Sequence, residues 1–321
     1  MRKRLAAIAV VACAAMAMLA PSAAWPQSAR AVKLVVPYPP GGGADVLARV
    51  VADAIGKLQG PAMVVENRPG AGTVIGTQDV ARAVPDGNTL LFTNNALLLV
   101  PHIRKVDYDP FSSLSSICKI ATTPTIVVVN NASPYRTLGD LIGAARAKPG
   151  ELTFGAFPGA LSQVTWEMFL HRANIQMTLV PFNGTLPQVN ALLGQQIDAA
   201  IIEYPTVEGL LKSDKLRVLA STSAARVDWL PDVPTIAELG YKDFEIELWY
   251  GAFAPAHTPQ QIIAKFTDWF AKAAQAPQVR SKLLTDGIET SAVCGAPFVA
   301  YLQKRFDEYG QVIREANIKA D

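Results

Sequence analysis

Two parts of this 321-residue chain repeat one order of elements: a short apolar run, a glycine-rich turn and a helical pattern. The first repeat covers residues 35–58 and the second covers residues 152–172. Each turn therefore lies at the carboxyl end of a predicted strand and at the start of a predicted helix. Open α/β sheets bind ligands at that edge. If each half is one open α/β lobe, the two edges form a cleft for a small anion.

The remainder of the chain alternates in the same way, which favours α/β layers with mainly parallel sheets. Strands are expected at residues 32–36, 63–65, 89–93, 126–129, 152–154, 178–181, 199–202 and 245–249. Helices are expected at residues 45–58, 138–147, 162–172, 187–193, 259–276, 278–284 and 297–316.

The first turn, residues 37–45, reads PYPPGGGAD. Its glycines leave backbone N–H groups uncovered, and the helix that follows adds the positive end of its dipole. Together these make an anion site that needs no basic side chain. Asp45 is expected at the N-cap, where its carboxylate satisfies N–H groups of the helix or accepts from a ligand. A tight turn before a capped helix is the alternative, and the motifs of dinucleotide and phosphate loops are incomplete here.

The second turn, residues 155–163, reads GAFPGALSQ and carries no charge. An anion at this turn would be held by backbone N–H groups, Ser162 and Gln163, with Phe157 as an apolar wall. A plain connection between strand and helix is the alternative.

The N-terminus has the order of a secretory signal: basic residues 2–4, an apolar run over residues 5–20, and the small residues Ser22 and Ala24. We expect cleavage after Ala24 and export to a periplasm. A membrane anchor is the first alternative, but the run is shorter than the ~20 residues of a span. A lipoprotein acylated at Cys13 is the second, and it would leave almost no apolar region before the cysteine.

The formal charge of the whole chain is +2, from 29 basic and 27 acidic side chains. Removing residues 1–24 removes three basic and no acidic side chains, which leaves a formal charge of −1. This net charge is far too weak for the basic surface by which a protein binds nucleic acid, so we expect no nucleic-acid partner. Any anion is then captured locally and not by net charge.

Two cysteines, Cys118 and Cys294, remain after cleavage. In an oxidising compartment such a pair forms a disulfide or stays as two buried thiols, and the sequence leaves both open.

Signatures of catalysis are sparse. The three histidines are far apart, and the motifs of hydrolases and metal sites are absent from the sequence. Asp198 and Glu203 could form an acid–base pair, but their spacing across a strand end favours a rim or hinge position. We therefore expect no enzyme and no cofactor or metal. A hydrolase or isomerase that uses the glycine turn as an oxyanion hole is the alternative.

Seven motifs in this order resemble the extracytoplasmic solute receptors of the tripartite tricarboxylate transporter family, known as Bug-type receptors. They are VPYPPGGGAD at residues 36–45, VENRPGAG at 65–72, PDG at 85–87, KPG at 148–150, LLGQQID at 192–198, LPDVPT at 230–235 and APAHTP at 254–259. The resemblance implies a type II periplasmic-binding-protein fold with a small carboxylate between two lobes. Lobe 1 would comprise residues 25–122 and 230–321, and lobe 2 would comprise residues 123–229.

The resemblance also implies the site residues and the partners. From the first turn it implies Tyr38, Gly42, Gly43 and Asp45, and from the second Phe157, Gly159, Ala160, Ser162 and Gln163. The receptor would be a monomer that delivers its ligand to a two-component integral membrane permease, with a sensor as the alternative partner. The chain departs from the family pattern at residues 156–158, at Gln163, where a histidine is expected, and at Asn88. These departures leave open which organic acid binds.

Overall fold

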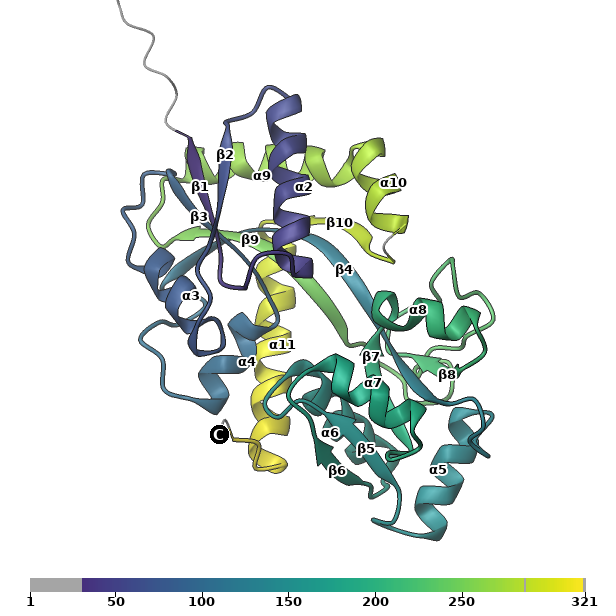
Figure 1. The fold of residues 1–321 in the computed structure, drawn as a ribbon. Helices are drawn as coiled ribbons and strands as arrows, with labels where there is room; N and C mark the ends of the chain where they lie inside the picture. Colours follow the sequence, from purple (N-terminus) through teal and green to yellow (C-terminus); the bar gives the residue numbers. More distant parts are fainter. Residues whose placement is uncertain (1–30, 286, 320–321) are drawn as a thin grey trace, which may run out of the picture. The chain divides into compact units, whose positions relative to one another are not determined.

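The computed structural model describes residues 31–285 and 287–319, and Figure 1 shows its ribbon. The predicted signal peptide at residues 1–24 and Cys13 lie outside the described residues. The strands are β1 (Val32–Val36), β2 (Met63–Asn67), β3 (Thr89–Asn94), β4 (Leu114–Asn130), β5 (Thr153–Ala156), β6 (Thr178–Pro181), β7 (Ala199–Glu203), β8 (Leu216–Ser221), β9 (Glu247–Pro255) and β10 (Glu289–Cys294). The helices are α2 (Gly43–Lys57), η1 (Ala71–Thr73), α3 (Val74–Ala81), α4 (Ala96–Ile103), α5 (Leu138–Ala147), α6 (Leu161–Ala173), α7 (Thr185–Leu193), α8 (Tyr204–Lys212), α9 (Gln260–Gln275), α10 (Pro277–Thr285) and α11 (Ala296–Glu315).

The long strand β4 runs through two groups of strands (Figure 1). In the first group β1 lies parallel between β2 and β3, and in the second β5 lies parallel between β6 and β7. β4 pairs with β9 and β10 up to Pro124 and with β7 and β8 from Thr125 onward. The predicted α/β class is confirmed. The predicted parallel pairing holds around β1 and β5, and the antiparallel pairs all involve β4 or β9, which makes the sheet mixed.

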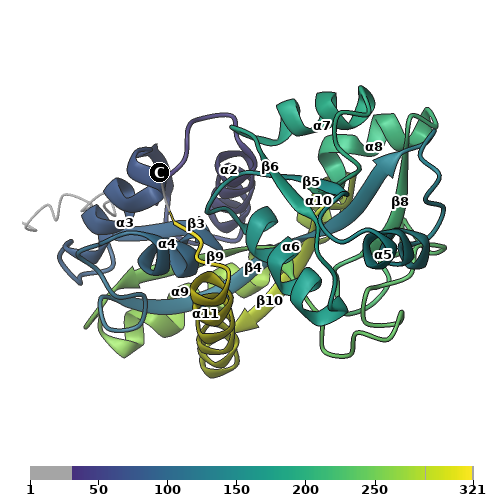
Figure 2. The same cartoon turned by 90° about the horizontal axis from the view of Figure 1, so that it is seen from below.

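Both groups of strands are covered by helices on two faces, because successive side chains of a strand point to opposite sides. In β1, Leu34 packs in a core with α2 and α9, whereas the next residue, Val35, belongs to the core that contains α4. In β4, Val127 packs in the core with α5 and α6, whereas Val128 packs with α7 and α8. The helix α11 contacts both α4 and α6, as Figure 2 shows.

The strand β10 places Cys294 opposite Cys118 of β4, and the two sulfur atoms are bonded at 2.01 Å. Both cysteines belong to the first group of strands, and 176 residues of sequence separate them. Of the two states that the sequence left open, the structure contains the disulfide.

Candidate ligand cavity

The two glycine-rich turns fold in the same way. Each has a glycine with positive φ, Gly41 (82°) and Gly159 (72°), followed by an extended N-cap residue, Gly42 or Ala160. The N–H of each glycine donates to a side chain four residues later: Gly41 to Asp45 Oδ2 at 2.9 Å, and Gly159 to the Gln163 Oε1 at 2.8 Å. The repeat that the sequence predicts is therefore a repeat of backbone geometry.

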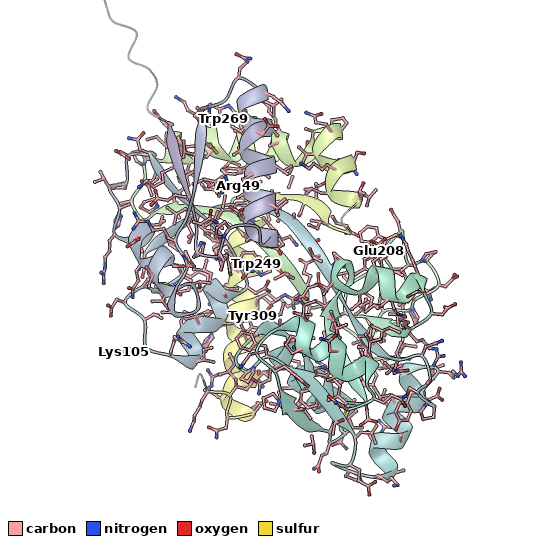
Figure 3. All side chains as sticks on the ribbon, viewed as in Figure 1. Arg49, Lys105, Glu208, Trp249, Trp269 and Tyr309 are labelled. Carbon is pink, nitrogen blue, oxygen red and sulfur yellow. A yellow bond between two sulfur atoms is a disulfide. The ribbon has the colours of Figure 1, made fainter. Side chains whose placement is uncertain are left out.

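The prediction that Asp45 is the N-cap is wrong, because α2 begins two residues earlier and Gly42 is its N-cap. Asp45 is the third residue of the helix, and its side chain is buried. Its carboxylate accepts hydrogen bonds from Gly41, Arg49 and Asn67. The hydrogen bond from Arg49, which Figure 3 labels on α2, lowers the pKa of Asp45 to about 2. The carboxylate therefore holds the turn in place as a permanent anion.

A cavity of about 350 Å³ lies where β3, β5 and β7 end. Five of the predicted site residues line it: Tyr38, Phe157, Gly159, Ala160 and Ser162. The other four, Gly42, Gly43, Asp45 and Gln163, are not among its lining residues. The second turn thus faces the cavity directly.

The first turn lines the cavity through Tyr38, whereas its Gly43 lies against Tyr250. A Cβ placed on Gly43 would lie 3.1 Å from the Tyr250 hydroxyl, so the turn and the tyrosine are in close contact. Burial raises the pKa of Tyr250, and the nearby Glu203 and Tyr38 raise it further. Glu203 and Tyr38 both line the cavity. Tyr250 thus contacts the first turn and lies near two residues of the cavity wall, Tyr38 and Glu203.

The N-termini of five helices meet at this cavity. The N-cap residues of α3, α4, α6, α7 and α8 are all among its lining residues, namely Thr73, Asn95, Ala160, Gly184 and Glu203. A helix N-terminus has N–H groups without an intrahelical partner and the positive end of the helix dipole. At α3 and α4 part of these groups is already bonded, because an N–H at the start of α3 donates to Ala71 O and the Ala96 N–H donates to Asn94 Oδ1. The cavity is consequently a favourable place for an anion.

Three of these N-cap residues, Thr73, Asn95 and Gly184, are not predicted from the sequence. A polar residue or glycine directly before an apolar helical run is a signal for a helix N-terminus, and Asn95 before Ala96–Ile103 fits that pattern. That signal predicts where a helix begins, but it does not show which helix N-termini lie together at one cavity.

Several polar atoms in the cavity wall have no hydrogen-bond partner within the described part of the chain. They are Thr73 Oγ1, Gln188 Oε1 and Arg104 Nε, and all three atoms are buried. Arg104 is held in place because its Nη1 donates to Ala71 O at 3.2 Å. Phe157, which is 46% exposed, adds an apolar surface. The wall therefore combines apolar surface with polar groups that a ligand can satisfy.

The acid–base pair considered from the sequence does not form. Glu203 ends β7, whereas Asp198 precedes that strand and accepts from Thr153 N and Oγ1 at 2.7 and 2.8 Å. Five residues of strand separate them by roughly 17 Å. None of the three histidines is among the lining residues of the cavity, and Ser162 Oγ accepts from the Phe157 N–H.

No helix within residues 31–285 and 287–319 combines the length and the apolar character of a membrane span. The same ranges contain no group of three or more His, Cys, Asp or Glu side chains that could hold a metal ion.

The model of the tripartite tricarboxylate transporter family receptor matches residues 47–318. The chain belongs to this family. The resemblance that the seven motifs indicate is thus confirmed. The chain is 32% identical over 320 residues to protein BugT of Bordetella pertussis, with 98% of each chain covered.

Solved structures give the same result for the fold. The periplasmic binding protein BugD is 28% identical with a TM-score of 0.73, covering 91% of this chain and 99% of that one. A protein of R. palustris, Rpa4515 with adipate, is 29% identical with a TM-score of 0.75, covering 92% and 99%. These comparisons identify the chain as a periplasmic solute-binding protein of the receptor family.

Proposed function

We propose that this receptor binds a small organic acid in the cavity and delivers it to a two-component membrane permease. The observation that carries the proposal is the meeting of five helix N-termini at one cavity. Their N–H groups stabilise a carboxylate without a net positive charge on the protein, which agrees with the formal charge of −1 after residues 1–24 are removed. The adipate in the similar R. palustris structure supports the same class of ligand.

The ligand would lie between two lobes that close on it by a hinge motion. In support, β4 changes partners between Pro124 and Thr125, close to the predicted boundary between residues 122 and 123. The cavity takes Tyr38 and Arg104 from one side of that boundary and Phe157 and Glu203 from the other. A ligand that contacts both lobes favours the closed state over the open one. We expect the receptor to act as a monomer and to break no bond of its ligand.

Calorimetry on the protein without residues 1–24 tests the proposal, with a panel of mono- and dicarboxylates, amino acids and neutral amides of matched size. Saturable binding of acids, with the acid recovered unchanged, is the expected result. Product formation would instead favour a hydrolase or isomerase. Folded protein that binds no acid of the panel would contradict the proposal.

A variant at the first turn tests whether both turns bind. Gly42 has an extended backbone, and an added Cβ would lie 3.6 Å from Pro39 O, so Gly42→Val is compatible with the fold. Gly42 does not line the cavity, so the variant asks whether the N–H groups of its turn also contact the ligand. If they do, the valine side chain covers them and abolishes binding. Unchanged affinity would remove the first turn from the site.

A further inference from the structure

Glu203 is the only carboxylate among the lining residues of the cavity. It lies at the carboxyl end of β7 and is the N-cap of α8. Within the described residues, its side chain forms no hydrogen bond with another residue and no ion pair. Burial raises its pKa, because nearby protein replaces water around the carboxylate. Its carboxylate accepts only from its own backbone N–H, so the cavity contains an anionic acceptor to which no other described residue donates.

Gln188 of α7 adds a second acceptor from the same group of strands and helices. Its side chain is 2% exposed, and its Oε1 accepts no hydrogen bond from the described residues. A buried acceptor without a donor is costly, and native proteins satisfy such groups with a ligand, an ion or water. Two acceptors in one wall call for a ligand that donates hydrogen bonds there.

Arg104, which belongs to the first group of strands and helices, provides a cationic donor instead of an acceptor. It is the C-cap residue of α4, its guanidinium lies 3.8 Å from the position of a Cβ on Gly72, and its buried Nε donates to no described residue. It is the only basic side chain among the lining residues of the cavity. One wall therefore offers a cation and the other an anion.

We infer that the ligand is a zwitterion, a small carboxylic acid that also carries a protonated nitrogen, and that Glu203 and Gln188 bind this nitrogen. The inference rests on the proposed function and narrows it. The carboxylate of the ligand is bound by the helix N-termini and Arg104, as for any acid. The negative charge of Glu203, which no neighbouring cation balances, would repel a second carboxylate of the ligand. An ammonium group would instead form an ion pair with Glu203. Glu203 is thus a residue that determines specificity.

Calorimetry with matched ligands tests this assignment. The first pair is glutarate and 4-aminobutanoate, which differ by the exchange of one carboxylate for an ammonium group. The second pair is glutarate and glutamate, which differ by one added ammonium group. We expect the aminated member of at least one pair to bind at least tenfold more tightly. Glu203→Gln should reduce this ratio of affinities by about tenfold or more, because the amide oxygen still accepts a hydrogen bond but lacks the negative charge of the carboxylate.

Glu208→Gln is the matched control. Glu208 lies on α8, as labelled in Figure 3, pairs with Lys212, and is not among the lining residues. This variant should keep the ratio of the wild type. Circular dichroism establishes that each variant is folded. If Glu203→Gln does not fold, the ratio of the affinities of the wild type for the aminated ligands and for glutarate tests the assignment by itself.

Two results would count against the account in different ways. Glutarate that binds as tightly as its aminated partners, or a ratio that Glu203→Gln leaves unchanged, would overturn the assignment of Glu203 and leave the proposed function standing. Folded protein that binds none of the acids would contradict the proposed function itself.

Discussion

Replacing Gly159 by alanine should destabilise the protein more than the equivalent change at Gly41. Both glycines have positive φ and both donate their N–H to a side chain four residues later. A residue with a side chain is destabilised by about 1–2 kcal/mol in this conformation, and this cost applies equally at both positions. They differ in their surroundings: a Cβ on Gly41 meets nothing within 4 Å, whereas a Cβ on Gly159 lies 3.0 Å from Ile103 Cδ1.

The contact at 3.0 Å forces a shift of the isoleucine or of the turn, which adds about 1 kcal/mol or more. We therefore expect Gly41→Ala to lower the free energy of unfolding by about 1–2 kcal/mol and Gly159→Ala by about 2–4 kcal/mol. Urea unfolding followed by circular dichroism measures both values, provided that the slope of the free energy of unfolding against urea concentration is the same in the variants and the wild type.

Ile103→Val removes the atom in contact and completes a double-mutant cycle. In that background the cost of Gly159→Ala should fall to the cost at Gly41, with a coupling of about 1 kcal/mol. Equal costs at the two glycines, or a cost at Gly159 that Ile103→Val does not change, would refute the assignment of this contact.

Three further predictions use other parts of the fold. The pKa of Asp45 is about 2 in the folded state, below its ordinary value of about 3.9, so its stabilising effect is present above pH ~4 and is lost as the pH falls toward 2. The difference in urea midpoint between the wild type and Asp45→Asn should therefore shrink from pH 6 to pH 2.5, and a constant difference would contradict this. Ser162→Ala should weaken ligand binding about fivefold, through the loss of a hydrogen bond of about 1 kcal/mol, and calorimetry showing unchanged affinity would place the hydroxyl away from the ligand. Replacing Cys118 and Cys294 together by serine should lower the free energy of unfolding by up to about 5 kcal/mol, because the bond closes a loop of 176 residues, whereas two free thiols in the denatured, unreduced mature protein would show that the bond is absent.

The parallel part of the fold could be predicted from local patterns. The strand β1 and the helix α5 have the expected bounds, because an uninterrupted apolar run and a helical repeat each identify one element. The strand β4 is longer than expected, since Lys119 and Pro124 interrupt its apolar pattern. Its first half is held by pairing with β9 and β10, which are distant in sequence. Such pairing is a tertiary effect that local patterns do not contain.

Other elements were missed for local reasons. The helix α8 begins at Tyr204 directly after β7 ends at Glu203, so no turn separates the two patterns. The helix α4 contains Pro101, which hides its helical character. Both elements contribute N-cap residues to the cavity, so missing them concealed part of the site.

The site itself could be predicted in part. The second turn was found because its glycine and its place after a strand are both visible in the sequence, and Phe157 to Ser162 line the cavity. The spacing of Asp198 and Glu203 across a strand end predicts a rim or hinge position for Glu203. The residues that line the cavity with it come from segments far away in the chain, which that spacing does not show. The pairing of an acceptor wall with Arg104 depends on which helix ends meet, and only the folded chain brings them together.

A structure of the protein crystallised with its bound acid would show where the ligand lies. We expect a ligand carboxylate within hydrogen-bond distance of the N–H groups at residues 161–163, inside the cavity that Tyr38, Arg104 and Glu203 line. A ligand outside this cavity, or one whose carboxylate stays away from the N-terminus of α6, would contradict the account.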